Sequence, residues 1–334
     1  MSRRALITGA AGEVGRRLAR QMVADGWEVR ALVLPADPLR ARLQGIVGDI
    51  HEGDVRDAAS LGPACAGVDT VVHLAAVILT QDHAQYDQIN RRGTANLVQA
   101  AASAGVRHFV YISSASVVYP RLTPYGQSKL DAERIVAAET RFAHTIVRPT
   151  LVYDATGAQE FMLFRRYLLR FPFLPFVPFV GAGRSRKRPV YSDDVVDGLA
   201  RIAGNEVAFG RTYNLSGGEA ITLGDLARLV LALEGRPRPL LPLPVSLCKV
   251  AAWALGALMR NPPLTPYAIA GFTNDADLDP ALATAELGYQ PRGVRSGLTA
   301  CFTPLAATAS GGPSTNRAVR PAGTGPSGPL GSTR

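Results

Sequence analysis

The first 150 residues alternate between short apolar runs and stretches in which apolar residues recur at helical spacing. Four runs are typical of buried strands, at residues 5–7, 28–34, 70–75 and 108–113. Helical patterns follow the first run at 12–25 and separate the last two at 90–104. This strand–helix–strand alternation predicts an α/β fold, a doubly wound parallel sheet with helices on both faces.

The pattern changes after Thr150. Residues 161–180 are rich in Phe, Leu and Pro and predict a helix followed by an irregular apolar segment. Further helices are expected at 193–202, 223–233 and 245–258. We therefore expect three parts. They are a sheet domain over 1–150, to which segments such as 189–216 return, a smaller lobe over 151–303, and a disordered tail over 304–334.

A glycine-rich turn joins the first expected strand to the first helix. Gly9, Gly12 and Gly15 stand at GxxGxxG spacing within Thr8-Gly9-Ala10-Ala11-Gly12-Glu13-Val14-Gly15. Glycines there permit a tight turn, close approach of the backbone to a pyrophosphate, and close packing of helix on strand. The helix N-terminus adds free N–H groups and a positive dipole end. The motif predicts that residues 1–150 form a Rossmann-type NAD(P)-binding domain.

Two further strand ends indicate the same ligand. Asp54 places a carboxylate where it could accept from an adenine amino group, and Leu74-Ala75-Ala76 could let the backbone lie against ribose and nicotinamide. A strand-end turn and core packing are the respective alternatives. The strand ending at Leu34 carries neither the acid typical of a 2′-hydroxyl site nor the arginine typical of a 2′-phosphate site. NAD is favoured, with NADP as the alternative.

The candidate chemistry lies at the start of a later helical stretch. Tyr125 and Lys129 stand four residues apart, which places both on one helix face. The Lys129 ammonium is expected to lower the pKa of Tyr125, which could then pass a proton to or from a substrate oxygen while a hydride moves. Upstream, Ser113 and Ser114 end an apolar run at the sheet edge where such folds bind ligands. Ser114 could hydrogen-bond the reacting oxygen, unless these serines only cap backbone groups.

In combination, these motifs resemble the extended short-chain dehydrogenase/reductase superfamily, which includes NAD-dependent epimerases, dehydratases and 3β-hydroxysteroid dehydrogenases. The ordered motifs are the glycine loop, Gly53-Asp54-Val55-Arg56-Asp57, His73-Leu74-Ala75-Ala76, Asn90 with Gly93-Thr94-Ala95-Asn96-Leu97, Ser113-Ser114, residues 125–129 and Arg148-Pro149-Thr150. The resemblance continues through 189–195 and 213–218 and covers roughly residues 4–300.

The resemblance implies a role for each matching residue. Ser114 would be the hydroxyl donor, Tyr125 the acid/base, and Lys129 the group that activates the tyrosine and binds the nicotinamide ribose. Pro149 would border the nicotinamide. The implied cofactor-binding set is Thr8, Gly9, Gly12, Glu13, Val14, Gly15, Asp54, Val55, Leu74, Ala75, Ala76, Asn90, Ser113, Tyr125, Lys129 and Pro149.

The substrate side departs from the family pattern. Only 11 positions (125 − 114) separate Ser114 from Tyr125, where the family usually has a longer segment. An alignment on Val118-Tyr119 would instead put Ala115 at the hydroxyl position. The asparagine that usually holds substrate phosphates after the sixth strand is missing.

A basic segment offers a substitute for that asparagine. Arg186, Lys187 and Arg188 could clamp a diphosphate or form a solvated basic loop. The substrate is then a nucleotide-linked sugar or, given the apolar segment 171–180, a hydrophobic hydroxy compound.

Composition narrows the choice of partners. The chain has 334 residues and a formal net charge of +9, but no nucleic-acid motif accompanies its scattered arginines, so no nucleic-acid partner is expected. Three widely spaced cysteines without ligand spacing predict neither disulfides nor a metal site and favour a cytoplasmic location. Residues 240–259 are apolar but contain two prolines and Lys249. They predict a buried helix, with peripheral membrane contact as the alternative.

Two classes of function fit these features. The first is an NAD(P)-dependent oxidoreductase or epimerase that transfers hydride at a secondary alcohol or ketone of a small-molecule substrate. The second is a catalytically silent dinucleotide-binding accessory or regulatory subunit, resembling the accessory protein of respiratory complex I. The presence of both Tyr125 and Lys129 favours turnover. Analogy with the family also suggests a homodimer paired through the helices around Asn96 and Lys129.

Overall fold

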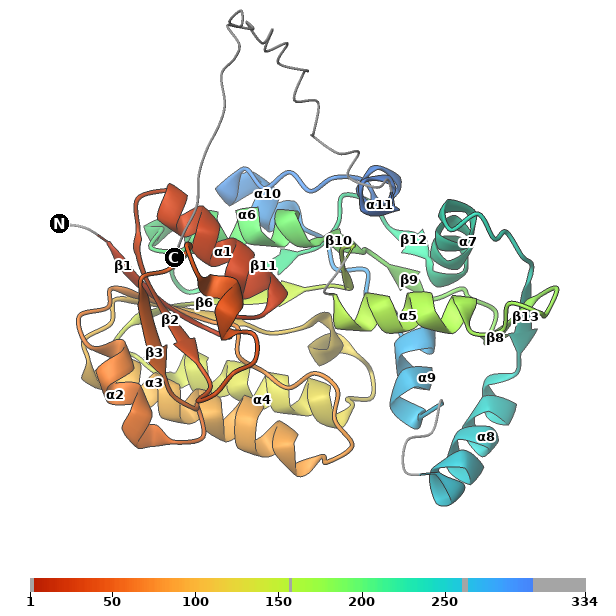
Figure 1. Cartoon of the computed structure of the whole chain (residues 1–334), viewed down its shortest axis with the longest axis horizontal. Helices are drawn as coiled ribbons and strands as arrows, with labels where there is room; N and C mark the ends of the chain where they lie inside the picture. The colour runs from red at the N-terminus through yellow and green to blue at the C-terminus, as the bar shows by residue number, and fades with distance from the viewer. Residues whose placement is uncertain (1–2, 156–157, 260–263, 303–334) are drawn as a thin grey trace, which may run out of the picture. The chain divides into compact units, whose positions relative to one another are not determined.

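Seven parallel strands form the central sheet in the order β11-β6-β5-β4-β1-β2-β3 (Figure 1). The computed structural model describes residues 3–155, 158–259 and 264–302, and the expected tail at 304–334 lies outside them. The strand order reverses between β1 and β4, where open α/β sheets bind ligands at the carboxyl ends. The predicted doubly wound α/β fold is confirmed. The strands are β1 (Arg4–Thr8), β2 (Glu28–Val33), β3 (Asp49–Glu52), β4 (Thr70–His73), β5 (His108–Ile112), β6 (Ala143–Pro149) and β11 (Arg211–Leu215).

Helices cover both faces of the sheet because its strands are apolar on both sides (Figure 1). One face carries α1 (Glu13–Ala24), α6 (Ser192–Ile202) and α10 (Ala281–Leu287). The other carries α2 (Ala58–Cys65), α3 (Thr94–Ser103) and α4 (Pro124–Ala138). Both α6 and β11 come from the segment 189–216, so a late part of the chain completes the sheet domain. Short 3₁₀ turns lie at η1 (Arg40–Leu43), η3 (Ala115–Val118) and η4 (Glu206–Ala208).

The helix expected over 90–104 is divided in two. A π-helix, η2 (Tyr86–Gly93), precedes α3 and begins before the apolar pattern does. At Gly93 a Cβ would lie 2.7 Å from the Val55 side chain, so only glycine lets this turn pack on the chain after β3. Wide helical turns of this kind are rare and often occur at functional sites. This one places Asn90 toward the carboxyl edge of the sheet.

Beside the sheet, further helices and three short strand pairs of the described residues gather around a second core, called here the smaller lobe. Its core contains Tyr153, Phe161 and Phe179, packed against α7. Residues 177–180, expected to be irregular, form a strand because pairing with residues 240–243 satisfies the backbone of an apolar segment. The elements are α5 (Gln159–Leu169), α7 (Leu223–Leu233), α11 (Val294–Phe302), and the pairs β7 (Val152–Tyr153) with β10 (Val190–Tyr191), β9 (Arg186–Lys187) with β12 (Ile221–Thr222), and β8 (Val177–Val180) with β13 (Leu240–Leu243).

Two helices, α8 (Val245–Leu258) and α9 (Pro266–Thr273), extend from the end of this lobe that is far from β1 (Figure 1). The helix bounds 245–258 agree with the sequence prediction. The expected burial of this helix is wrong, because Trp253 is 76% exposed and Leu258 is 83% exposed. Within the described ranges, no helix has the length and apolar character needed to cross a membrane.

Candidate active site

The glycine loop forms a tight cradle between β1 and α1. Gly9 has a φ of +67°, and a Cβ there would lie 2.9 Å from the Ala75 nitrogen. A Cβ at Gly15 would lie 2.3 Å from the Gly9 carbonyl oxygen, which no larger residue could accommodate without moving the backbone. Gly12 precedes α1, and no side chain caps this helix N-terminus. The N–H groups of the first turn therefore face outward as donors, which fits a pyrophosphate.

A buried chain of hydrogen bonds ties this loop to the neighbouring strand. The Ala75 N–H donates to the Thr8 hydroxyl oxygen at 3.1 Å, and that hydroxyl lies 2.7 Å from Nδ1 of His73. On the other side of the ring, Nε2 lies 3.0 Å from the hydroxyl of Thr94, which donates to the Asn90 carbonyl at 2.6 Å. Thr94 already uses its proton, so Nε2 of His73 is the donor and Nδ1 accepts from Thr8.

The imidazole of His73 is consequently neutral, and it connects Thr8 to Thr94. Burial, reinforced by the charge of Lys129, lowers the pKa of His73 to about 3. A neutral ring satisfies both threonines, whereas a protonated ring would turn Nδ1 into a donor and take away the acceptor of the Thr8 hydroxyl proton. His73 thus fixes the distance between the glycine loop and the backbone at 74–76, the two segments predicted to hold the dinucleotide.

Several of the predicted cofactor residues already have protein partners. Glu13 accepts from Arg16 and from Arg17, each at 2.9 Å. Asp54 pairs with Arg56 at 2.6 Å, which lowers the pKa of the Asp54 carboxyl. Both carboxylates are therefore already paired with arginines of the same chain.

The remaining members of the predicted set lie at the strand ends. Val14 packs against the core beneath α1, and Val55 is buried beneath η2. The backbone at Leu74 and Ala76 follows β4, and Pro149 ends β6. Ser113 is buried, and its Oγ has no hydrogen-bond partner among the described residues. Such an unsatisfied polar atom at the carboxyl edge of the sheet is suited to a ligand.

Asn90 acts as a clamp between three segments. Its amide oxygen accepts from the Val77 N–H at 2.9 Å, and its amide nitrogen donates to the Val77 carbonyl at 2.9 Å and to Ser128 Oγ at 3.1 Å. Ser128 in turn donates to the Tyr125 carbonyl at 2.8 Å. Asn90 therefore joins the loop after β4 to the turn of α4 that carries Tyr125. All its hydrogen-bonding groups are used within the protein.

The predicted catalytic residues converge at the N-terminus of α4. Thr123 caps this helix by accepting from the Gly126 N–H at 3.1 Å, so Tyr125 lies in its first turn. Ser114, which caps η3, lies near enough to the Tyr125 phenol to act on the pKa of that phenol. The same Ser114 oxygen is 3.0 Å from Ser116 Oγ, which donates to it. Of the two alignments, the geometry favours the one with Ser114 at the hydroxyl position.

Lys129 is buried one turn beyond Tyr125, but its ammonium lies over another ring. Its Nζ is 4.4 Å from the centre of the Tyr111 ring. Burial lowers the pKa of Lys129 to about 7, against the opposing charge of Glu133. Burial, with the nearby carboxylate of Glu160, raises the pKa of Tyr125 above its usual value, and the Ser114 hydrogen bond only partly offsets this. The expected lowering of the pKa of Tyr125 is therefore wrong for this arrangement.

Sequence reasoning missed an ion pair that supports Lys129. Arg148 in β6 donates to both carboxylate oxygens of Glu133, at 2.9 and 2.6 Å. Glu133 is buried and stands four residues after Lys129, on the same face of α4. The i, i+4 spacing of Lys129 and Glu133 was the available signal in the sequence.

Aromatic and titratable side chains border the outer side of Tyr125. The Tyr86 ring centre lies 6.0 Å from that of Tyr125, and His83 links Tyr86 to Tyr267 of α9, with ring centres 6.0 and 5.1 Å apart. Glu160 and Tyr119 lie near enough to Tyr125 to raise the pKa of its phenol. Sequence reasoning missed this group because its members come from four separate segments of the chain.

The side chains of the basic segment that was predicted to clamp phosphates form hydrogen bonds with other groups of the protein. Arg186 and Arg188 both donate to Asp277, at 3.0 and 2.5 Å. The Lys187 ammonium is buried and donates to the carbonyls of Gly271 and Asn274, at 2.9 and 2.5 Å. The three side chains are thus brought together, but against acidic and carbonyl groups of the same lobe. This does not favour a diphosphate clamp.

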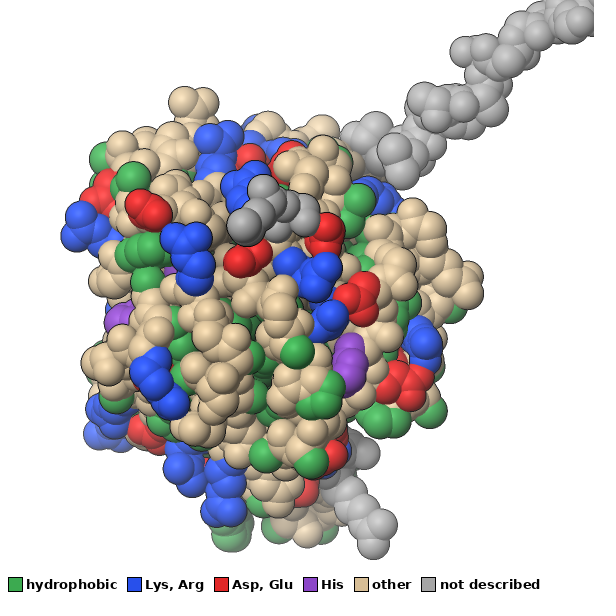
Figure 2. Space-filling view, turned by 90° about the vertical axis from the view of Figure 1, so that its left-hand side faces the viewer, with side chains coloured by type: hydrophobic (Ala, Val, Ile, Leu, Met, Phe, Trp, Pro, Cys, Tyr) green, Lys and Arg blue, Asp and Glu red, His purple; other side chains and the backbone are tan. Residues whose placement is uncertain are grey.

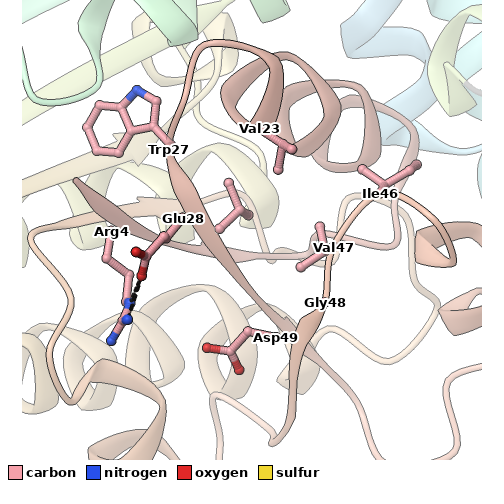
Figure 3. A pocket seen from close by; sticks show the side chains of 9 residues that line it. Arg4, Val23, Trp27, Glu28, Ile46, Val47, Gly48 and Asp49 are labelled. Atoms are coloured by element: carbon pink, nitrogen blue, oxygen red, sulfur yellow. Dashed lines mark hydrogen bonds and ion pairs between the residues drawn. The ribbon is translucent and has the colours of Figure 1, made fainter. Parts of the chain in front are cut away.

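One shallow hollow lies at the opposite edge of the sheet. It is lined by residues at the starts of β1, β2 and β3, including Arg4, Glu28 and Asp49, and Figure 3 shows Arg4 paired with Glu28 within it. Ligands of such sheets bind at the carboxyl ends of the strands, so this hollow is not the dinucleotide site.

On the face drawn in Figure 2, red carboxylates lie beside many of the blue basic side chains. Among the described residues, no cluster of His, Cys, Asp or Glu could hold a metal ion.

The end of β2, where the adenosine ribose would lie, has paired arginines nearby. Arg40 pairs with Glu52, and Arg42 lies 3.7 Å from a carboxylate oxygen of Glu13. An arginine that recognises a 2′-phosphate would have to leave its carboxylate first. The arrangement is better suited to a ribose 2′-hydroxyl than to a phosphate.

Comparison with known proteins identifies the family. Residues 5–216 match the NAD dependent epimerase/dehydratase family. The chain is 32% identical over 257 residues to the uncharacterized protein y4nL of Sinorhizobium fredii, covering 67% of this chain and 70% of that protein. It is 29% identical over 326 residues to the 3-beta-hydroxysteroid dehydrogenase of Mycolicibacterium neoaurum, covering 86% and 87%. The crystal structure of gox2253 superposes with a TM-score of 0.72 and 28% identity, covering 88% of this chain and 95% of that one. The chain therefore belongs to the NAD-dependent epimerase/dehydratase family, within the extended short-chain dehydrogenase/reductase superfamily.

Proposed function

We propose that this protein is an NAD-dependent dehydrogenase or reductase that interconverts a secondary alcohol and a ketone in a hydrophobic hydroxy compound. The observation that carries the proposal is the convergence of Ser114, Tyr125 and Lys129 beside a loop shaped for a dinucleotide. The cradle at Gly9 and Gly15, in which a Cβ would clash, fits the pyrophosphate of NAD. The partnerless Ser113 hydroxyl lies at the same sheet edge.

The residues of this site divide the chemistry between them. NAD supplies the hydride acceptor when it is bound, and NADH supplies the donor. Tyr125 exchanges the proton with the substrate oxygen, as an acid in ketone reduction and as a base in alcohol oxidation. Ser114, which lies near that phenol, holds the same oxygen in position. Lys129, one helical turn from Tyr125, stabilises negative charge that develops on the phenol oxygen once its amine turns from the Tyr111 ring toward Tyr125.

The hydrophobic substrate class is supported by the surroundings of Tyr125. The border of that residue is largely aromatic, and the arginines that could bind a diphosphate are paired with Asp277. The similarity to a 3-beta-hydroxysteroid dehydrogenase over most of both chains supports the same class. A nucleotide-linked sugar, and epimerisation of such a sugar, is the competing hypothesis.

A substrate panel tests this proposal. The protein is incubated with NAD and hydroxysteroids, long-chain secondary alcohols or nucleotide sugars, and in the reverse direction with NADH and the matching ketones. We expect NADH formation or consumption with the hydrophobic class. Turnover confined to nucleotide sugars would show that the substrate class is wrong. NAD binding without turnover in either direction would favour the accessory-subunit hypothesis. The homodimer stays a prediction by analogy, to be tested by sedimentation.

A further inference from the structure

Helix α8 presents its large apolar side chains to solvent and its small ones to the protein. Leu247, Val250 and Trp253, each three residues apart, are 57%, 64% and 76% exposed. Cys248 and Ala252, four residues apart, are buried in a small cluster with Val180 and Ile269. A helix on the surface of a soluble domain normally has the reverse arrangement. The outer face of α8, defined by Leu247, Val250, Trp253 and Leu258, is therefore a contiguous exposed apolar surface.

The segment that forms this face carries charges of one sign. Residues 235–274, which contain β13, α8 and α9, include no Asp or Glu, and their described part carries Arg236, Arg238 and Lys249. In the neighbouring α5 and β8, the one carboxylate is Glu160 in the first turn of α5, against Arg165 and Arg166 of the same helix. Carboxylates of the same lobe, such as Glu234 and Asp277, are already paired with Arg165, Arg186 and Arg188. The segment that carries the outer face of α8 is thus basic as well as apolar.

These properties fit an anionic lipid surface. The 14 residues of α8 span about 21 Å, which is too short for the roughly 30 Å hydrocarbon core, so the helix would lie in the plane of the interface. Tryptophan is favoured at the level of the lipid headgroups, and basic residues are attracted to anionic lipids. A second copy of the chain is a poorer occupant, because a symmetric contact would bring like charges together.

We propose that the outer face of α8 docks this protein onto the surface of an anionic lipid bilayer. The docked helix packs on α9, which connects it to the side of the molecule that carries the candidate active site. Its partner α9 carries Tyr267, whose ring packs on His83, and His83 stacks on Tyr86 beside Tyr125. Membrane docking by itself requires neither NAD nor turnover, so it can be tested separately from the proposed enzymatic activity.

Co-sedimentation with vesicles tests the proposal on the full chain. Vesicles contain equal parts of phosphatidylcholine and phosphatidylglycerol, or phosphatidylcholine alone. We expect binding to the mixed vesicles that weakens when salt is raised, and weaker binding to phosphatidylcholine. The V250E/W253E double variant, at two exposed positions, should lower the partition coefficient by about tenfold or more. The matched variant V207E/L282E places the same charges on two exposed apolar residues outside this lobe and should bind like the unaltered protein.

Tryptophan fluorescence gives a second readout. The chain has two tryptophans, and Trp27 is buried beneath Arg3 whereas Trp253 is exposed. On mixed vesicles the emission should shift to the blue, and quenching by acrylamide should fall. The proposal is overturned if the unaltered protein stays in the supernatant with every vesicle. It is equally overturned if the protein self-associates without vesicles and V250E/W253E abolishes that association, since a second copy would then cover the face.

Discussion

The imidazole of His73 lies 2.7 Å from the hydroxyl of Thr8, and this contact joins the two segments that border the predicted dinucleotide site. Thr8 ends β1 and His73 ends β4, and the two residues are paired in register across the sheet. The ring is neutral because both of its nitrogens have fixed partners and because burial opposes a charge.

Neutral His73 makes the fold sensitive to acid. The pKa of His73 is lowered from 6.5 to about 3 in the folded chain. Between these two pH values the unfolded chain binds a proton at His73 and the folded chain does not. The stability that the neutral ring contributes is therefore complete above pH 6.5 and is lost as the pH falls toward 3. His108, buried with its pKa lowered to about 4, adds to the loss. A His73→Asn variant should reduce the pH slope of the unfolding free energy between pH 6 and 4 by about 1.4 kcal/mol per pH unit. Urea unfolding across that range measures it, and an unchanged slope would contradict the neutral assignment.

Gly15→Ala should damage both the loop and NAD binding. The added Cβ would lie 2.3 Å from the Gly9 carbonyl oxygen, so β1 and α1 would have to separate. We expect a loss of about 1–3 kcal/mol in unfolding free energy and at least a tenfold weaker NAD affinity by calorimetry. The control is Gly256→Ala, where no atom lies within 4 Å of the added Cβ and a helix former replaces glycine in α8. Equal NAD affinity in both variants would show that the glycine loop does not hold NAD.

Lys129 is expected to destabilise the cofactor-free protein, because its amine is buried. Its pKa is lowered to about 7 from 10.5, so the unfolded chain binds more protons between these values and stability rises with pH across that window. A Lys129→Met variant should therefore be at least as stable as the unaltered protein at pH 7, with a difference that narrows toward pH 10. Turnover should fall by about a hundredfold or more. A variant that is less stable at pH 7 and by the same amount at pH 10 would contradict the burial of a titrating amine.

Discrimination against NADP should depend on the pairing of Arg40 with Glu52. With both Arg40 and Arg42 beside carboxylates, we expect NADP to bind about tenfold or more weakly than NAD. Glu52→Gln frees the Arg40 guanidinium and should improve NADP affinity while leaving NAD affinity unchanged. Titration of each dinucleotide measures both constants. Tighter binding of NADP than of NAD by the unaltered protein would contradict the predicted preference for NAD.

Local patterns in the sequence predicted much of the cofactor half of the site. Glycine spacing at 9, 12 and 15 and the four-residue step from Tyr125 to Lys129 are properties of a single turn or helix, and the structure places them as expected. The direction of the Lys129 amine was not predictable, because Tyr111 comes from a different strand.

The substrate half depends on contacts between distant segments. Arg186 and Arg188 seemed free to bind phosphate in the sequence, but Asp277 reaches them across 89 residues or more. Residues 177–180 gave no strand signal of their own and become a strand by pairing with residues 240–243. The exposure of Trp253 likewise follows from which face of α8 meets Val180 and Ile269. The sequence could not indicate that face, because apolar residues lie on every side of this helix.

Replacement of Tyr125 by phenylalanine tests the central claim most directly. The variant keeps the ring that lies beside Tyr86 and removes only the phenol hydroxyl near Ser114. With a substrate identified from the panel, kcat should fall by about 10²- to 10⁴-fold, while the calorimetric affinity for NAD changes by less than about threefold. A Tyr125→Phe protein that binds NAD and turns over at the rate of the unaltered protein would show that Tyr125 is not the proton-transferring group.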